Sequence, residues 1–90
     1  MKNTTEINTI LDERGKNYGE FKTHAEITMM FKRILADYQI EKFDDDQIEA
    51  LHMIFHKIGR IINGDPNYID SWIDIAGYAK LVSDRLEKKD

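Results

Sequence analysis

Hydrophobic residues recur along this chain at the spacing of α-helices. Four segments place apolar residues three and four positions apart, and no segment sustains the alternation of apolar and polar residues that marks a strand. The single proline, Pro66, and most of the glycines fall between these segments. The pattern therefore predicts an all-α fold built from four helices.

The first predicted helix carries a short apolar stripe formed by Ile7, Ile10 and Leu11. Asn3 and Glu6 form a variant capping box at its start, and Gly15 supplies the left-handed residue at which many helices stop. The next residues, GKNYGEF, place glycines on both sides of Tyr18. We expect an ordered loop there.

The second predicted helix opens at a capping box formed by Thr23 and Glu26 and ends near residues 38–40. His24, in its first turn, is interpreted as incidental. Aspartates 44–46 precede the next helix, where carboxylates cap free amide groups and favour the positive end of the helix dipole. The core-facing stripe of the second helix consists of Ala25, Ile27, Thr28, Phe31, Ile34, Leu35 and Tyr38.

The third predicted helix spans about residues 46–63 and stops at Gly64, and the fourth begins at 67–70 and continues to about Leu86. At about 100° per residue, each helix turns one apolar face inward. The third helix contributes Ile48, Leu51, Ile54, Phe55, Ile58, Ile61 and Ile62. The fourth contributes Trp72, Ile75, Ala76, Ala79, Val82 and Leu86. Trp72 and Phe55 are interpreted as core or dimer-interface residues.

A short connection joins the last two predicted helices, so we expect them to pack antiparallel as a hairpin. Folding the chain at the Gly-Asp-Pro break places Arg60 level with Asp70. The same fold places His56 or Lys57 level with Asp74. The charged side chains then meet at one end of the hairpin.

Gly59 and Gly77 lie inside these two helices, where glycine costs about 1 kcal/mol relative to alanine. A glycine kept at that cost usually allows close packing or the access of a ligand. Both glycines therefore predict the close approach of a neighbouring backbone. We expect the first two helices to pack on the hairpin.

Two interpretations of the charged cluster remain open. Asp70 and Asp74 lie one turn apart and repel each other unless a positive group lies between them. Lys57 and Arg60 supply that charge in an ion-pair cluster, where each partly exposed pair contributes about 1 kcal/mol or less. Alternatively, the two basic groups bind phosphate, and the two aspartates with His56 hold a cation such as Mg²⁺ or orient the basic groups.

A histidine pair raises the question of a metal site. His52 and His56 are one helical turn apart, which suits metal ligation when a carboxylate such as Asp74 joins them. Solvated histidines on a helix surface have the same spacing. Both interpretations therefore remain open.

Two tyrosines are candidates for stacking on a nucleotide base. Tyr18 lies near Arg14 and Lys16, so its ring and these cations suit a base with its phosphates. Its alternative role is to pin the first helix onto the bundle. Tyr78 lies near the charged end, where its hydroxyl reaches either a ligand or the neighbouring helix.

Composition limits the classes of function. The chain, residues 1–90, forms a single domain, and we expect so small a chain to bury further apolar surface, including Leu81, in a homodimer. A net charge of −4 argues against a dedicated nucleic-acid-binding surface. There is no cysteine, no signal-peptide pattern and no apolar run near the roughly 18 residues that span a bilayer. We expect a cytoplasmic protein.

Three blocks, ERGKNYGEF, ALHMIFHKIGRIINGDP and DSWIDIAGYAKLV, resemble a family of small phage and prophage proteins of unknown function. That family resembles the phage domains associated with nucleotide modification and, more distantly, the all-α nucleotide pyrophosphohydrolases of the MazG type. In those enzymes, E-x-x-E and E-x-x-D pairs hold magnesium for hydrolysis of nucleoside triphosphates. In place of the first pair this chain has His56, Lys57 and Arg60. Acidic character is kept at Asp70 and Asp74.

The resemblance implies a MazG-like helical bundle and a phage-encoded accessory protein that binds a nucleotide or nucleotide derivative at the Lys/Arg/Asp cluster. A degenerate pyrophosphohydrolase that kept activity would catalyse Mg²⁺-dependent hydrolysis of a phosphoanhydride bond. The alternative is a non-catalytic interaction protein, for example a phage inhibitor of a host defence complex. Its partner would be a host protein, and the charged cluster would only stabilise the hairpin.

Overall fold

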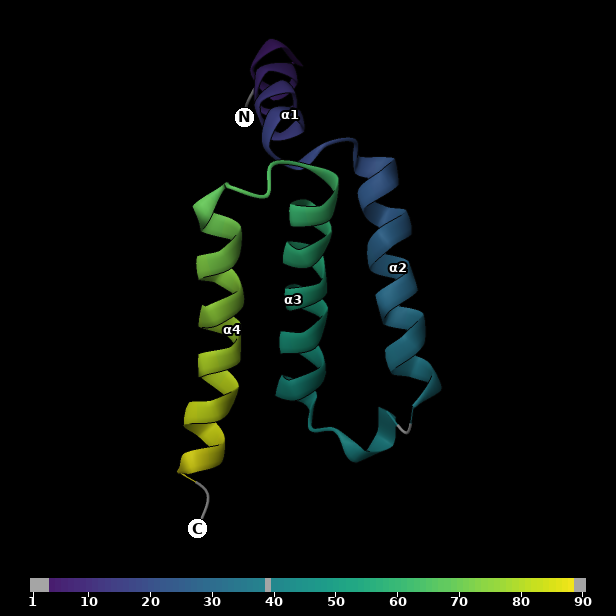
Figure 1. Ribbon diagram of the computed structural model, residues 1–90, viewed down its shortest axis with the longest axis vertical. Coiled ribbons are helices and arrows are strands. Elements are labelled where there is room, and N and C mark those ends of the chain that lie inside the picture. The colour runs from purple at the N-terminus through teal and green to yellow at the C-terminus, as the bar shows by residue number, and fades with distance from the viewer. Residues whose placement is uncertain (1–3, 39, 89–90) are drawn as a thin grey trace.

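The computed structural model describes residues 4–38 and 40–88, so the predicted cap at Asn3 lies outside the described residues. These residues contain no strand, and the predicted all-α class is confirmed. Four α-helices follow one another with short connections, one of which contains a 3₁₀ turn (Figure 1). Their bounds are α1 Thr4–Tyr18, α2 Phe21–Asp37, α3 Asp45–Asn63 and α4 Ile69–Glu87, with the turn η1 at Ile40–Lys42.

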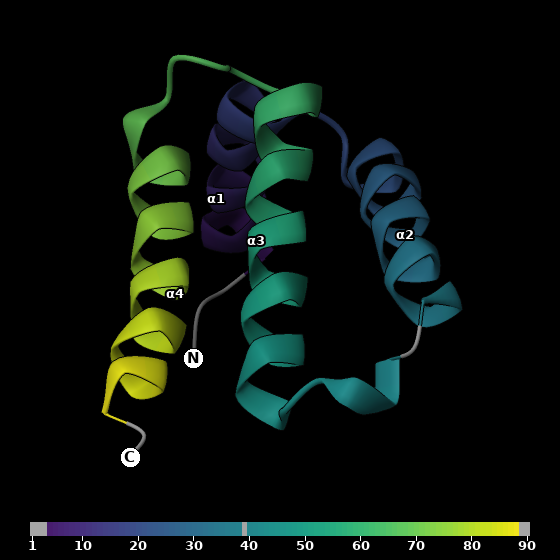
Figure 2. The ribbon, with the colours of Figure 1, turned by 60° about the horizontal axis from the view of Figure 1, so that its bottom comes forward.

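Helix α3 lies at the centre, with α4 antiparallel on one side and α2 antiparallel on the other (Figure 1). The predicted hairpin of the last two helices is therefore confirmed. In the described part of the chain α2 and α4 do not contact each other, so α2, α3 and α4 form a single layer. Helix α1 packs against α2 and α3 and projects behind the layer, as Figure 2 shows.

Helix α1 continues past its predicted stop. Gly15 lies inside the helix with open space around it, and the helix ends at Tyr18. Gly19 follows in the left-handed region with φ of 78°. The predicted stop at Gly15 and the predicted loop through Tyr18 are wrong, because the second glycine of the motif supplies the left-handed residue that ends the helix.

The start of α2 also differs from the prediction. The helix begins at Phe21, directly after the extended residue Glu20, and Thr23 lies in its first turn. The predicted cap at Thr23 is therefore wrong. Only one residue separates the left-handed glycine from the helix, so the chain enters α2 before it reaches the threonine.

The start of α3 is held by a capping box and by the end of α4. The Asp44 N–H donates to Gln47 Oε1 at 2.8 Å, which confirms that the acidic run caps this helix. The Arg85 guanidinium contacts Asp44 at 2.9 Å and Asp46 at 2.7 Å. Hydrogen bonds from Arg85 lower the pKa of Asp46. These contacts connect α3 and α4 at the end opposite to the hairpin tip.

The layer has a thin hydrophobic core. Of the hydrophobic residues described, only Leu35 and Ala50 are buried. The α2–α3 seam is closed by Phe31 and Phe55, whose rings stack with centres 5.4 Å apart. None of the helices described is both long enough and apolar enough to cross a bilayer.

The two glycines inside the hairpin have different surroundings. A Cβ at Gly59 would lie 2.9 Å from Thr28 Cγ2 and 3.0 Å from His24 Nδ1, so the predicted close approach is confirmed there, with side chains as the neighbours. Nothing lies within 4 Å of a Cβ at Gly77. The same prediction is wrong for Gly77, because this residue lies on the outer side of α4.

Trp72 is not a core residue of the single chain. It is 53% exposed, and its indole N–H donates to the Pro66 carbonyl at 2.8 Å. Helix α4 instead buries Ser71. Of the two predicted roles, that of a core residue is wrong, because in the described part of the chain α4 packs along α3 alone and leaves much of its own surface uncovered.

Residues 17–20 and 63–65 cross at the hairpin tip, and we call this contact the glycine junction. The Asn63 side-chain amide donates to the Tyr18 carbonyl at 2.9 Å and to the Glu20 carbonyl at 2.8 Å. One side chain thus satisfies two backbone acceptors in the α1–α2 turn. The turn is thereby fixed to the end of α3.

Both glycines of this junction lie where a side chain does not fit. A Cβ at Gly19 would collide with Asn63, and a Cβ at Gly64 would collide with the backbone of Asn17 and Tyr18. The Asp65 N–H donates to the Asn17 carbonyl at 2.7 Å beside this contact. The two turns can therefore cross only as bare backbone.

We predict that Gly64→Ala lowers the free energy of unfolding by about 1–3 kcal/mol, because overpacking forces the two turns apart. Gly77→Ala is the matched control, since its Cβ enters open space in a helix interior. It should raise the free energy of unfolding by up to about 1 kcal/mol. Urea unfolding curves of both variants measure the difference, and equal effects would contradict the junction's role.

Candidate functional site

The charged residues near the hairpin tip separate onto two sides of α3. Lys57 points toward α4, where its Nζ lies 3.0 Å from Asp74 Oδ2. Arg60 contacts Tyr18 of α1 instead. A step of three residues changes direction around a helix by about 60°, so the two basic side chains reach different neighbours.

The Lys57–Asp74 ion pair belongs to the seam between α3 and α4. Lys57 is buried, whereas the Asp74 side chain is 44% exposed. A buried ammonium without a partner is strongly destabilising, so the Asp74 carboxylate stabilises the position of Lys57 between the helices. The prediction that Lys57 lies level with Asp74 is confirmed.

Arg60 and Asp70 are connected through two tyrosines rather than by an ion pair. The Arg60 guanidinium lies 4.4 Å from the centre of the Tyr18 ring. That ring meets the Tyr68 ring edge-on, with centres 5.7 Å apart. A hydrogen bond with Asp70 and the charge of that carboxylate raise the pKa of Tyr68. These contacts support the predicted role of Tyr18 in pinning α1 to the hairpin.

Two histidines meet in the seam between α2 and α3. His24 Nε2 and His56 Nδ1 lie 3.3 Å apart, at hydrogen-bond distance. His24 is buried, and its Nδ1 atom has no hydrogen-bond partner. Burial is the largest cause that lowers the pKa of both histidines, and the nearby charges of Arg60 and Lys32 lower both further. The lowered pKa values therefore favour the neutral form of both rings at neutral pH.

A cavity of about 420 Å³ opens beside this pair, between α1, α2 and α3. Two arginines, two histidines and two aromatic rings converge on it, with a single carboxylate, Glu20. The cavity therefore presents an excess of positive charge and hydrogen-bond donors. Its lining residues are Leu11, Arg14, Gly15, Tyr18, Gly19, Glu20, Phe21, His24, His56 and Arg60.

The structure divides the residues predicted to form one site. His56, Arg60 and Tyr18 line the cavity, together with the arginine predicted to accompany Tyr18. The other predicted site residues lie outside the lining: Lys57, Asp70, Asp74 and Tyr78. His24 was interpreted as incidental, and its burial against His56 shows that this interpretation is wrong. Gly59 in α3 indicated that part of another helix packs closely there. The sequence does not identify His24 as the residue that faces this glycine.

The predicted metal ligands are not gathered. Across residues 4–38 and 40–88, no three side chains of His, Cys, Asp or Glu are placed to hold a metal ion. His56 turns toward His24, whereas Asp74 pairs with Lys57 on the other side of α3. Of the two interpretations of the histidine pair, the structure does not assemble the metal set of His52, His56 and Asp74, because His56 and Asp74 turn to different neighbours.

The histidine pair predicts a loss of stability in mild acid. Because the pKa of His24 and His56 is lowered from 6.5, the folded protein binds fewer protons than the unfolded chain below that pH. Stability is fully present above pH 6.5 and falls as the pH decreases. We expect the melting temperature to decrease between about pH 7.5 and about pH 5.5.

Two variants test whether the pair of His24 and His56 causes this pH dependence. His24→Gln removes one titrating group of the pair and should flatten the curve of melting temperature against pH. His52→Gln lies outside the pair and should keep the slope of the parent protein. A parent curve that is flat over this range would show that the histidines do not titrate with unfolding.

The chain has no match among curated proteins or among solved structures. It does match one family, over residues 4–86, and this match includes all four helices almost completely. Both motifs that cross at the glycine junction and all residues that line the cavity lie inside the matched range. The chain therefore belongs to the family described as Domain of unknown function (DUF6378).

Proposed function

We propose that this protein binds a nucleotide or a nucleotide derivative in the cavity between α1, α2 and α3. The observation that carries the proposal is the convergence of Arg14, Arg60 and the neutral histidine pair on a space of about 420 Å³. Guanidinium groups suit phosphate because their planar N–H groups match its oxygens. The arginines are the proposed phosphate contacts.

The aromatic residues at the cavity supply a surface for the base. Phe21 is 81% exposed and stacks on His24 with ring centres 6.2 Å apart. Stacking on an exposed aromatic ring is a common way to hold a nucleobase without reading its identity. Tyr18 is already occupied on one face by Arg60, so Phe21 is the better platform.

The histidine pair makes binding sensitive to protons. Both rings are neutral because burial and neighbouring cations oppose their charging. A phosphate placed among Arg60 and His56 would supply negative charge and favour the protonated ring. Binding should therefore be accompanied by proton uptake below neutral pH.

Mg²⁺ enters this proposal only together with the phosphates of a nucleotide. The cation prefers oxygen ligands, which phosphates and carboxylates provide. Of the two aspartates predicted to hold a cation, Asp74 already pairs with Lys57. Asp70 takes part in none of the described ion pairs. The residues do not form a metal site by themselves, so we propose binding and no hydrolytic step.

The biological setting in this proposal rests on the sequence resemblance. The blocks that resemble phage and prophage proteins support a phage-encoded accessory role, in the cytoplasm where nucleotides are available. The distant resemblance to MazG-type enzymes supports descent from a pyrophosphohydrolase. His56, Lys57 and Arg60 stand where those enzymes carry an acidic pair, and this substitution favours phosphate contact over metal ligation.

A non-catalytic interaction protein is the second candidate, and exposed apolar side chains favour it. Ile73 and Leu81 on α4 are 56% and 68% exposed. Exposed apolar groups of this kind commonly mark protein-binding surfaces. In this alternative a host protein is the partner, and the cavity holds no ligand.

We predict that nucleotides raise the melting temperature of the parent protein, because a ligand that binds only the folded state stabilises it by mass action. The test uses pyrophosphate and nucleoside mono- and triphosphates, each with and without Mg²⁺. Arg60→Met should abolish the ligand-induced shift while lowering the stability of the free protein only modestly, by about 0.5–1 kcal/mol from the lost ring contact.

Arg33→Met is the matched control, since Arg33 is an exposed arginine of α2 outside the cavity. This variant should keep the full shift. An equal shift of the melting temperature in Arg60→Met and in the parent would show that the nucleotide binds outside the cavity. No shift of the parent with any of these compounds would favour the interaction protein.

A further inference from the structure

The chain exposes more surface than a compact protein of its mass. Its accessible surface is 6910 Å², whereas a compact monomer of 10.6 kDa exposes about 5,500 Å². Its Cα radius of gyration is 15.6 Å, against about 12 Å for a compact domain of this length. The excess of about 1,400 Å² is larger than the roughly 800 Å² that one partner buries in a standard interface.

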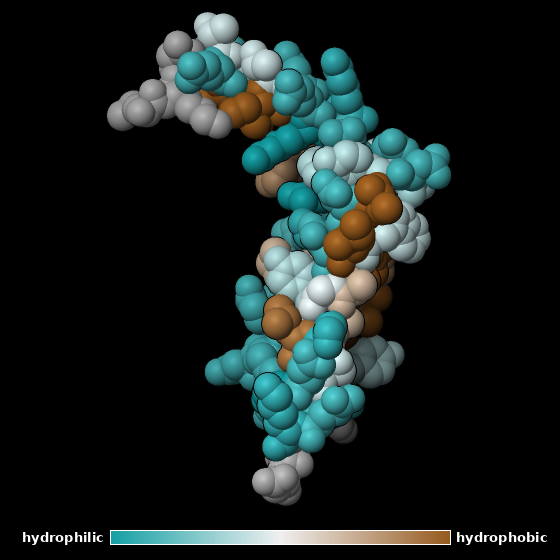
Figure 3. Space-filling view, turned by 90° about the vertical axis from the view of Figure 1, so that its left-hand side faces the viewer, coloured by the Kyte–Doolittle hydropathy of each residue, from teal (hydrophilic) through white to brown (hydrophobic). Residues whose placement is uncertain are grey.

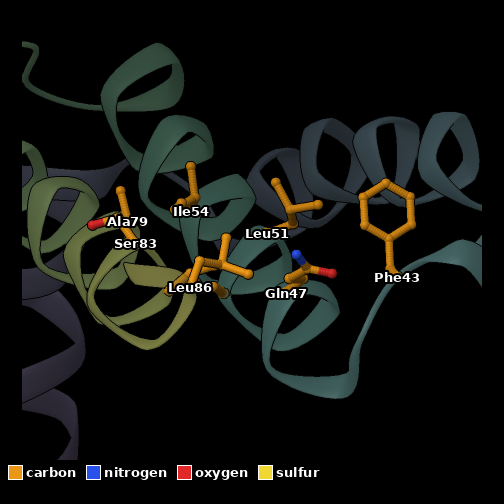
Figure 4. Close-up of a pocket in the computed structure, with 9 residues that line it drawn as sticks. Phe43, Gln47, Leu51, Ile54, Ala79, Ser83 and Leu86 are labelled. Atoms are coloured by element: carbon orange, nitrogen blue, oxygen red, sulfur yellow. The ribbon is translucent and has the colours of Figure 1, made fainter. Parts of the chain in front are cut away.

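Part of this surface is an apolar face of the helical layer. A groove of about 320 Å³ runs between α3 and α4, with Leu51 and Ile54 on one wall and Leu86 on the other (Figure 4). Ala79 and Ser83 of α4 line the same groove, so its walls carry no charge. Figure 3 views the layer from its α4 edge, where further apolar residues are exposed.

The apolar surface continues from this groove onto α2. Leu51 lies one turn from Phe55, whose ring stacks on Phe31 of α2. Ile34 lies one turn beyond Phe31 and is 57% exposed. We call this surface the open face. Its most prominent residues are Ile34 of α2 and Tyr38 directly after that helix, Leu51 and Ile62 of α3, and Trp72 and Leu86 of α4.

The ion pair between α3 and α4 does not line the groove. Lys57 and Asp74 are absent from the groove lining and pair with each other at 3.0 Å. Leu81 follows Trp72 by nine residues, which is half a turn beyond two full turns and places it on the opposite side of α4. The open face is therefore confined to one side of the layer.

We propose that a second copy of this chain covers the open face, so that two layers pack into a symmetric helical bundle. The face extends over three helices, so a single partner helix seated in the groove would leave Ile34 and Tyr38 exposed. Neither its named residues nor the lining of its groove is charged, so these parts of two identical copies meet without like-charge repulsion. The excess of accessible surface over a compact monomer is also large enough for one partner's share of a standard interface.

This arrangement accounts for Trp72. Its indole ring is 53% exposed in the single chain, although the spacing of α4 marks it as a buried position. In the dimer the ring lies within the interface. The contact between copies then supplies the apolar burial that Leu35 and Ala50 provide only in part.

The test compares two lysine substitutions at exposed apolar positions. Ile62 and Leu81 are 60% and 68% exposed, so neither substitution removes core packing from the single chain. Sedimentation equilibrium should show the parent as a dimer at micromolar concentration. Ile62→Lys should weaken association by at least about 30-fold, whereas Leu81→Lys should leave it unchanged.

Thermal unfolding supplies an independent measurement if Ile62→Lys does not fold. The melting temperature of a dimer rises with protein concentration, and that of a monomer does not. A parent protein that is monomeric, with a melting temperature independent of concentration, would overturn the proposal and leave the open face to a different protein. Equal weakening by Ile62→Lys and Leu81→Lys would also overturn it, because association would then not depend on this face.

Discussion

The fold depends on the glycine junction, where two turns of the chain cross without side chains between them. Gly19 and Gly64 provide bare backbone, and the Asn63 amide holds the turns together through two carbonyls. Helices α1 and α3 end at this crossing, and α2 and α4 begin within a few residues of it. The crossing therefore sets where α1 leaves the layer, and the cavity exists because α1 is held there.

The single layer of helices keeps the charged cavity apart from the uncharged open face. The cavity gathers positive charge and a neutral histidine pair between α1, α2 and α3. The open face gathers uncharged side chains of α2, α3 and α4 on one side of the layer. Helix α3 contributes to both because Arg60 and Leu51, nine residues apart, leave it on opposite sides. The proposed nucleotide and the proposed second copy consequently occupy different surfaces and do not compete.

The sequence alone determined the helical class, the hairpin and the level of Asp74, opposite either His56 or Lys57. Each of these follows from spacing within one helix or across one short turn, where geometry is set by the chain itself. The acidic cap at Asp44 belongs to the same group, since a helix start is a local feature. The sequence also showed that Trp72 belongs to an apolar stripe of its helix, but it does not show what covers that stripe.

Only the tertiary structure decided which of several locally acceptable choices is used. Gly15 and Gly19 both satisfy the rule for ending a helix, and the crossing with Asn63 selects the second. His24 has no local feature that marks it, and its role comes from a residue in another helix. Arg60 was expected near an aspartate and instead lies on a ring of α1. These outcomes depend on what lies opposite a residue in space, which spacing along one chain segment does not contain.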